Sequence, residues 1–326
     1  MLGAFGAVLG AFGAAGAQAA PQTYVLVVAG IGGEKKYADE FFEIGAKMSD
    51  AAVKAGVPAA NVTFLAEDPA RDAARVDGKS TREAVRGALA GYAERLREDD
   101  RLLVLLVGHG SMSGDEPRFN LPGPDLGAAD FARLLKPVRA QVAFVNASSA
   151  SGDFLKPVAG PRRVVVTATK SGFQRNHAVF GRYFVDAFAT GAGDADKDGR
   201  VSLLEAYAFA RREVQRYYEG QNALQTEHAQ LDDDGDGAAS GDTAGAKDGA
   251  RARAFVLGTT TAEAAVAASP AAAGLLAARR RLEEQVEALK RRKGTMPAAD
   301  YDRELERLLV ELATTNAAIR KAGSTP

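Results

Sequence analysis

The chain of 326 residues contains no cysteine. It therefore cannot form disulfide bonds, and no thiol is present to act as a nucleophile or as a metal ligand. Histidine is scarce as well, because only His109, His177 and His228 occur. These three residues are too scattered to indicate a histidine metal site. The fold must be held by its packed core and, where carboxylates gather, by metal ions.

An excess of positive charge is also missing, since the formal net charge is −1. Proteins that bind nucleic acid usually carry a basic patch, and none of that size is present. The densest basic stretches, 279–281 and 290–293, alternate with glutamates in an expected helix and indicate a solvated helix face. Nucleic acid is therefore not an expected partner.

Long apolar runs are absent except at the N-terminus. Residues 1–20 are uncharged, rich in alanine, glycine, leucine and phenylalanine, and end in Ala17-Gln18-Ala19-Ala20. This pattern predicts a secretory signal peptide. The basic residues that usually precede such a region are missing, which indicates a start further upstream. We expect a periplasmic or secreted protein of the bacterial envelope, with no transmembrane segment in the mature chain.

Apolar strands alternate with amphipathic helices in the first half of the chain. The expected strands are 23–29, 62–65, 102–107, 141–145 and 163–168, and the expected helices include 37–55, 80–96 with Ser80 as its N-cap, and 128–135. This alternation predicts an α/β fold: a doubly wound, mostly parallel sheet with helices on both faces. A late edge strand is expected at 252–257.

The second half of the chain divides by composition. The α/β domain is expected to span 21–258, followed by a linker at 259–273 that is rich in alanine and threonine. Two heptad-like apolar runs then predict a C-terminal helical hairpin at 274–322. Its apolar stripe needs a partner, either the body of the protein or another protein, including a second copy.

A twelve-residue acidic loop at 194–205 matches the calcium loop of an EF-hand. The expected metal ligands are Asp194, Asp196, Asp198, Arg200, Ser202 and Glu205. Oxygen-bearing side chains fall at the positions that the motif requires, glycine is at position six and an aliphatic residue at position eight. Apolar-periodic segments flank the loop, so we expect an inserted EF-hand at 180–217 with calcium as its cofactor.

A second acidic loop follows at 232–243. Asp232, Asp234, Asp236 and Gly235 repeat part of the calcium pattern, but no glutamate stands at position twelve. Two interpretations remain open: a weak calcium site formed by the three aspartates, or a disordered acidic tip.

Two neighbouring strands of the expected sheet end in reactive side chains. His109, within Gly108-His109-Gly110, follows the strand at 102–107, and the serine-rich run at 146–152 follows the strand at 141–145. Ligands of open α/β sheets bind at the carboxyl ends of the strands. These two tips are therefore the candidate site.

The pair of tips resembles the His-Gly and Cys-containing tips of the caspase-fold cysteine peptidases, most closely the legumain-like and metacaspase-like branches. The match of Ser151-Gly152 to the family's Ser-Gly puts Ser149 in the place of the nucleophilic cysteine. Further matches are the segment at 176–180 and Gln225-Thr226-Glu227-His228 ahead of the acidic loop. The resemblance covers about residues 23–230 and implies a caspase-like fold.

What the resemblance implies for function depends on Ser149. A serine hydroxyl is harder to deprotonate than a thiol and normally needs a histidine that a carboxylate orients. The sequence places no Asp or Glu to do this for His109, although Asp115 and Glu116 lie near it in the chain. We therefore expect a catalytically impaired peptidase homologue that binds a peptide or protein ligand. The alternative is an active peptidase or acyl hydrolase with Ser149 as nucleophile and His109 as general base.

Overall fold

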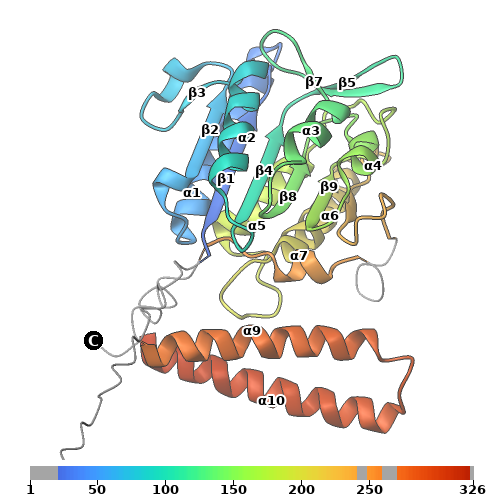
Figure 1. Cartoon of the computed structure of the whole chain (residues 1–326). Coiled ribbons are helices and arrows are strands. Elements are labelled where there is room, and N and C mark those ends of the chain that lie inside the picture. Colours follow the sequence, from blue (N-terminus) through green and yellow to red (C-terminus); the bar gives the residue numbers. More distant parts are fainter. Residues whose placement is uncertain (1–20, 241–247, 259–269, 324–326) are drawn as a thin grey trace, which may run out of the picture.

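The structure, a computed structural model, describes residues 21–240, 248–258 and 270–323. The expected signal peptide lies outside these residues, as does most of the expected linker. Seven strands form one sheet in the order β10-β9-β8-β4-β1-β2-β3 (Figure 1). They are β1 (Thr23–Ala29), β2 (Val62–Ala66), β3 (Gly78–Lys79), β4 (Arg101–Val107), β8 (Gln141–Asn146), β9 (Arg163–Thr167) and β10 (Gln230–Asp232). Only β10 runs antiparallel to its neighbour.

Helices cover both faces of this sheet. On one face lie α1 (Lys35–Lys54), α5 (Phe180–Thr190) and α6 (Leu203–Gly220). On the other lie α2 (Arg82–Arg95), α3 (Ala128–Leu135) and α4 (Leu155–Val158).

The central strand β4 shows how these two layers of helices use the sheet. Leu103 and Leu105 belong to the core that includes α1, α5 and α6. Leu102 and Val104 belong to the opposite core, which includes α2, α3 and α4. Successive side chains of a strand point to opposite faces, so both faces of β4 are buried. This is the arrangement that an almost wholly apolar strand predicts.

Three short antiparallel strands follow the tip of β4. They are β5 (Gly110–Ser113), β6 (Glu116–Phe119) and β7 (Leu126–Gly127). Short 3-10 helices occur at Ala59–Asn61, Pro69–Asp72 and Gly152–Phe154. The small sheet of β5, β6 and β7 extends the carboxyl edge of the main sheet, where the candidate site lies (Figure 1).

The prediction of an edge strand at 252–257 is wrong for most of these residues. The short helix α7 spans Ala250–Ala254, and beyond it Val256 forms only an isolated antiparallel bridge with Ser202. The Asp233 carboxylate accepts the backbone N–H of Ala252 at 2.8 Å, which satisfies a donor in the first turn of this helix. Alanine and arginine also favour a helix here.

The N-cap of α2 is also shifted by one residue from the prediction. Thr81, rather than Ser80, accepts the backbone N–H of Ala84 with its side chain. Both residues have a hydroxyl that could cap a helix. The choice between them follows from β3, because the Ser80 N–H bonds to the Ala66 carbonyl and continues the strand.

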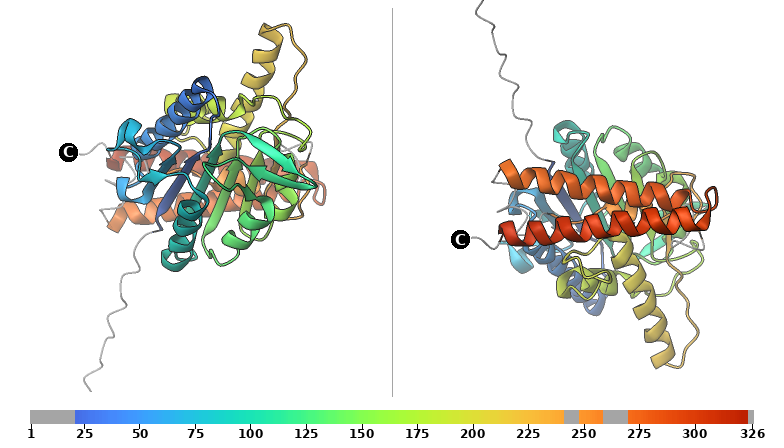
Figure 2. Two further views of the ribbon diagram at one scale, coloured as in Figure 1. Left: turned by 90° about the horizontal axis from the view of Figure 1, so that it is seen from above. Right: turned by 90° about the horizontal axis from the view of Figure 1, so that it is seen from below.

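Two long helices form the C-terminal part of the chain, α9 (Pro270–Arg291) and α10 (Ala298–Gly323). They pack against each other through Leu282, Val286, Leu289, Tyr301 and Leu308. This cluster is separate from the two cores of the sheet. Figures 1 and 2 show the pair below the amino ends of the parallel strands, away from the carboxyl edge. Over the described ranges, no helix is long and apolar enough to cross a membrane.

Candidate functional site

The tips of β4 and β8 lie side by side, because the two strands are parallel neighbours with Leu106 opposite Asn146. The contact between the tips is close at Gly110. A Cβ atom at this position would lie 2.1 Å from the Ser149 carbonyl oxygen, so only glycine fits. The structure therefore brings the His109 and Ser149 segments together, as the sequence predicts.

The Ser149 hydroxyl is hydrogen-bonded to the backbone of Gly110 rather than to the side chain of His109. Ser149 is 2% exposed, and its Oγ accepts the Gly110 N–H at 3.2 Å and lies 3.5 Å from the Gly110 carbonyl oxygen. Among the hydrogen bonds of the described residues, none joins Ser149 to His109. The expected nucleophile is thus buried and held by a group other than its expected base.

Neighbouring hydroxyl groups are buried with Ser149. The Ser148 hydroxyl donates to Asn146 Oδ1 at 2.6 Å, and the Ser151 hydroxyl lies 3.2 Å from that of Thr169. Ala150, between the serines, has a φ of 52°, a strained value for a residue with a side chain. Its N–H donates to the Gln174 carbonyl. The tip is therefore a tightly bonded turn.

The His109 ring lies among aromatic side chains of α1. Its centroid is 4.8 Å from that of Tyr37 and 4.9 Å from that of Phe41, both in edge-to-face geometry. Burial lowers the pKa of His109, and the nearby His177 lowers it further. A backbone hydrogen bond at Gly32 and the charge of Glu40 oppose this shift of the pKa. His109 is consequently biased toward its neutral form.

A carboxylate does orient a histidine here, but that histidine is His177. Glu40 Oε1 lies 3.1 Å from His177 Nε2, and this hydrogen bond lowers the pKa of Glu40. Asp115 and Glu116, the carboxylates nearest to His109 in the sequence, lie in the turn after β5 and at the first position of β6, respectively. Sequence reasoning missed Glu40 because it comes from α1, far from both histidines along the chain.

The segment at 225–228 supports the start of α5. Glu227 is 2% exposed and accepts the backbone N–H groups of Val179 and Phe180 at 2.9 and 3.1 Å. Burial raises the pKa of this carboxyl. His228 Nδ1 lies 2.7 Å from Gln174 Nε2, which joins this segment to the loop after β9.

The first acidic loop lies between α5 and α6, two helices that pack in the same core. Carboxylate oxygens of Asp194, Asp196 and Asp198 lie within 4.8 Å of one another. Glu205 bends back over the loop and accepts the N–H groups of Ala195 and Ser202 at 3.0 and 2.8 Å. Asp196 is exposed as a residue, but partial desolvation of its carboxyl group and the charges of Asp198 and Glu205 raise its pKa.

The remaining expected ligands of this loop make contacts of their own. The Ser202 hydroxyl bonds to Glu205 Oε2 at 2.8 Å. The Arg200 guanidinium pairs with Asp198 at 2.7 Å and with Glu283 of α9 at 3.1 Å. At the seventh position of such a loop, the backbone carbonyl rather than the side chain is the ligand. Arg200 therefore remains suitable as a ligand while its side chain contacts α9.

The second acidic loop gathers a different set of carboxylates from the predicted one. Oxygens of Asp232, Asp234 and Asp248 lie within 4.8 Å of one another, and Asp236 is outside this group. Asp232 is 1% and Asp248 is 4% exposed. Burial raises the pKa of Asp232 and of its neighbour Asp233. Asp248 was missed because no local pattern links it to a loop that begins much earlier in the chain.

Comparisons with known proteins add little to this geometry. No family model matches the chain, and no curated protein does. A crystal structure of a Geobacter sulfurreducens protein is similar with a TM-score of 0.41 and 13% identity, over 65% of this chain and 92% of that one. Raptor from Chaetomium thermophilum is similar with a TM-score of 0.35 and 10% identity, over 54% of this chain and 18% of that one. These similarities are too low to bear on function.

Proposed function

We propose that the protein is a calcium-binding homologue of the caspase-like and legumain-like peptidases in which hydrolysis is impaired. It would act by binding a peptide or protein at the carboxyl edge of the sheet, as a recognition or scaffold module. The observation that carries this proposal is the state of Ser149. Its hydroxyl is buried and bonded to Gly110, and among the described residues no carboxylate is hydrogen-bonded to the His109 ring.

The electrostatics of the site favour the same conclusion. Serine hydrolases normally use a histidine whose second nitrogen is held by a carboxylate, which also stabilises the imidazolium formed during reaction. Glu40 gives that support to His177. Burial disfavours the charged form of His109 and lowers its pKa, so it is a weak acceptor for the proton of a serine.

The alternative is an active peptidase or acyl hydrolase in which Ser149 is the nucleophile and His109 is the base. The adjacency of the two tips favours it, as does the Gly110 N–H, which could donate to an oxyanion if the serine turned away. Such a turn would have to break the contacts of Ser149 with the Gly110 backbone.

A serine-directed fluorophosphonate probe separates the two functions. We expect no labelling of the protein, and Ser149→Ala should give the same result. Labelling that Ser149→Ala abolishes would overturn the impaired state. Ser149→Cys provides a second test, because a thiol reacts with only modest help from histidine. Labelling of that variant by a cysteine-directed peptide probe would show that the peptide groove is intact.

Calcium is the proposed cofactor of both acidic loops. Grouped carboxylates at this spacing suit a hard cation with oxygen ligands, and burial of several like charges is costly unless a cation compensates for them. The first loop is at the end of α5 and the second follows β10, which runs antiparallel to the sheet. Both thus lie toward the amino ends of the parallel strands, opposite His109. We therefore assign calcium a stabilising role rather than a catalytic one.

Calorimetric titration of metal-free protein tests this assignment. We expect calcium binding that Glu205→Gln and Asp232→Asn each reduce, and weaker binding of magnesium, which demands a stricter octahedral geometry. Absence of calcium binding, or binding that neither substitution changes, would contradict the assignment.

Export and a protein partner complete the proposal. The pattern at 1–20 favours a periplasmic or secreted protein, and fractionation of cells that express the full chain tests it. The α9–α10 pair is the proposed contact for a protein partner, since Leu309 and Val310 of α10 are exposed. Loss of partner binding on removal of 270–323, with calcium binding retained, is the expected result.

A further inference from the structure

A cavity of about 450 Å³ lies between α1 and the loop that follows β2. Its base includes Ala29 and Gly30 at the end of β1 and Ala66 at the end of β2. It is therefore at the carboxyl edge of the sheet, where open α/β folds bind ligands, and its volume is in the usual range of ligand pockets.

This cavity is distinct from the tips that carry His109 and Ser149. Helix α1 separates them, since it presents Tyr37 and Phe41 to His109 and presents Ala38 and Phe42 to the cavity. The two sites are nevertheless close, because Gly30 packs against Gly108, directly before His109.

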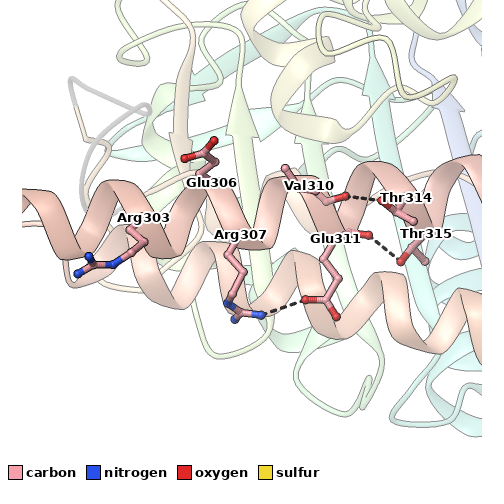
Figure 3. A pocket seen from close by; sticks show the side chains of 7 residues that line it. All are labelled: Arg303, Glu306, Arg307, Val310, Glu311, Thr314 and Thr315. Carbon is pink, nitrogen blue, oxygen red and sulfur yellow. Dashed lines mark hydrogen bonds and ion pairs between the residues drawn. The ribbon is translucent and has the colours of Figure 1, made fainter.

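A larger hollow on α10 is less informative. It is lined only by residues of that one helix, with Arg307 and Glu311 paired at 3.0 Å (Figure 3). Its charged side chains are more than half exposed at Arg303, Arg307 and Glu311. This is the geometry of a solvated helix face.

The charged side chains around the cavity beside α1 differ in whether they form ion pairs. Asp39 pairs with both cations of the lining, Lys35 at 2.5 Å and Arg71 at 2.7 Å. Glu67 and Asp68 form no ion pair within the part of the chain that the structure describes. Each accepts one backbone N–H, from Gly32 and Ala70 respectively. Two cations and three carboxylates leave the lining with a net charge of −1.

The remaining lining is apolar. Ala29, Ala38, Ala66 and Phe42 supply a surface on which a short aliphatic chain could lie. One guanidinium of the protein already lies over an aromatic ring of the lining: that of Arg71 is 4.3 Å from the centre of the Phe42 ring. Guanidinium groups are attracted to aromatic faces in this geometry.

We infer that this cavity binds a ligand with a single guanidinium or ammonium group on a short apolar stem. The cationic group lies at Glu67 and Asp68, and the stem lies on the alanines and Phe42. Such a ligand restores charge balance in the lining and leaves the Asp39 pairs in place. The same chemistry is offered by a free alkyl cation and by a basic side chain of a peptide.

Binding experiments with three compounds test the inference: butylguanidinium, pentanoate and an acetyl-Ala-Arg-Ala-amide peptide. Binding to the full chain is measured by calorimetry or by shifts of backbone amide resonances. We expect butylguanidinium to bind and pentanoate not to bind. Binding of the peptide as well assigns the site to basic side chains, whereas exclusion of the peptide assigns it to free cations. In either case resonances of residues 66–71 should shift and those of α10 should not.

The double substitution Glu67→Gln with Asp68→Asn should weaken butylguanidinium binding at least about tenfold, which corresponds to about 1.4 kcal/mol. Both replacements keep an oxygen that can accept the Gly32 and Ala70 N–H groups, so the fold should be retained. Glu43→Gln is the matched control, because Glu43 is on α1, 3.8 Å from Arg71, but does not line the cavity. Equal affinity in the double variant, tighter binding of pentanoate, or no saturable butylguanidinium binding would each overturn the inference.

Discussion

The two acidic loops differ in an instructive way. The loop at 194–205 has the complete calcium pattern in its sequence, yet Asp196 and Asp198 are exposed. The second loop has an incomplete pattern, yet the carboxylates of Asp232, Asp233 and Asp248 are almost completely buried. A complete motif thus identifies ligand types, whereas burial determines how much the fold depends on their charge being neutralised.

The hydrogen bonds of the carboxylates also differ between the two loops. Asp248 accepts N–H groups from Asp233, Asp234 and Ser240, and so joins three positions of the second loop. In the first loop, the carboxylates bond mostly to N–H groups within the loop itself, as Asp194 does with Asp198 and Gly199. We therefore expect the second loop to contribute more to global stability.

The largest effect should come from Asp248→Ala. It leaves buried N–H groups without an acceptor, and we expect a loss of about 3 kcal/mol in the free energy of unfolding. Asp196→Ala in the exposed loop is the matched control and should cost less than about 1 kcal/mol. Urea denaturation in the presence of a chelator measures both. Equal losses would remove the distinction between the loops.

Calcium itself should have the next largest effect. At a free concentration one hundred times the dissociation constant, a single site that exists only in the folded state adds about 2.7 kcal/mol. Asp232→Asn should abolish a larger share of the calcium-induced rise in Tm than Glu205→Gln does. A larger share for Glu205→Gln would reverse the comparison, and no rise at all would show that neither loop binds calcium.

The pH dependence of stability without metal should also distinguish the loops. Burial raises the pKa of Asp232 and Asp233, so the folded state holds these protons more tightly than the unfolded chain does. Their contribution to stability is complete below the unfolded pKa of about 3.9 and is lost as the pH rises through the folded value.

Asp232→Asn isolates the contribution of Asp232, because Asp233 and the other titrating groups are shared with the wild type. We expect the stability of the wild type, relative to the variant, to fall between about pH 4 and neutral pH without metal. Saturating calcium should reverse the trend, because it binds the deprotonated carboxylates. A pH-independent difference between the two proteins, measured by urea denaturation, would speak against buried charge in this loop.

The smallest effect should come from Arg200→Ala. Its guanidinium joins the exposed loop to Glu283 of α9, and partly exposed ion pairs of this kind contribute about 1 kcal/mol or less. We expect little change in global stability but faster proteolysis near the linker between the body and α9. Arg281→Ala, an exposed change on α9, is the control. Identical cleavage rates would show that the pair does not hold α9 on the loop.

Much of the sheet could be predicted from the sequence. The strands at 23–29 and 102–107 are apolar at nearly every position, because a parallel sheet covered on both faces buries both sides of each strand. The longer helices were also predictable, since their apolar residues recur with helical spacing, whereas the short helices α4 and α7 were not predicted. The segment at 252–257 was not, because its short apolar run suits a strand or a helix equally. Contact with Asp233 decided in favour of the helix.

The candidate site was predictable only in part. Its position followed from parallel strands, which place successive carboxyl ends at one edge. Which carboxylate meets which histidine depends on how α1 packs over that edge, and no local pattern encodes the contact between Glu40 and His177. The same limit applies to Asp248, which joins the second acidic loop from a distant position in the chain.

The sequence by itself determined which side chains are available here: no thiol, a serine-rich run after the strand at 141–145, and two loops rich in carboxylates. These are properties of residue type and local spacing, which the order of amino acids contains directly. The tertiary structure decided which groups meet, that Ser149 bonds to Gly110 rather than to His109, and which carboxylates are buried. Those outcomes depend on the packing of elements distant in the chain, because burial and non-local contacts exist only after the chain has folded.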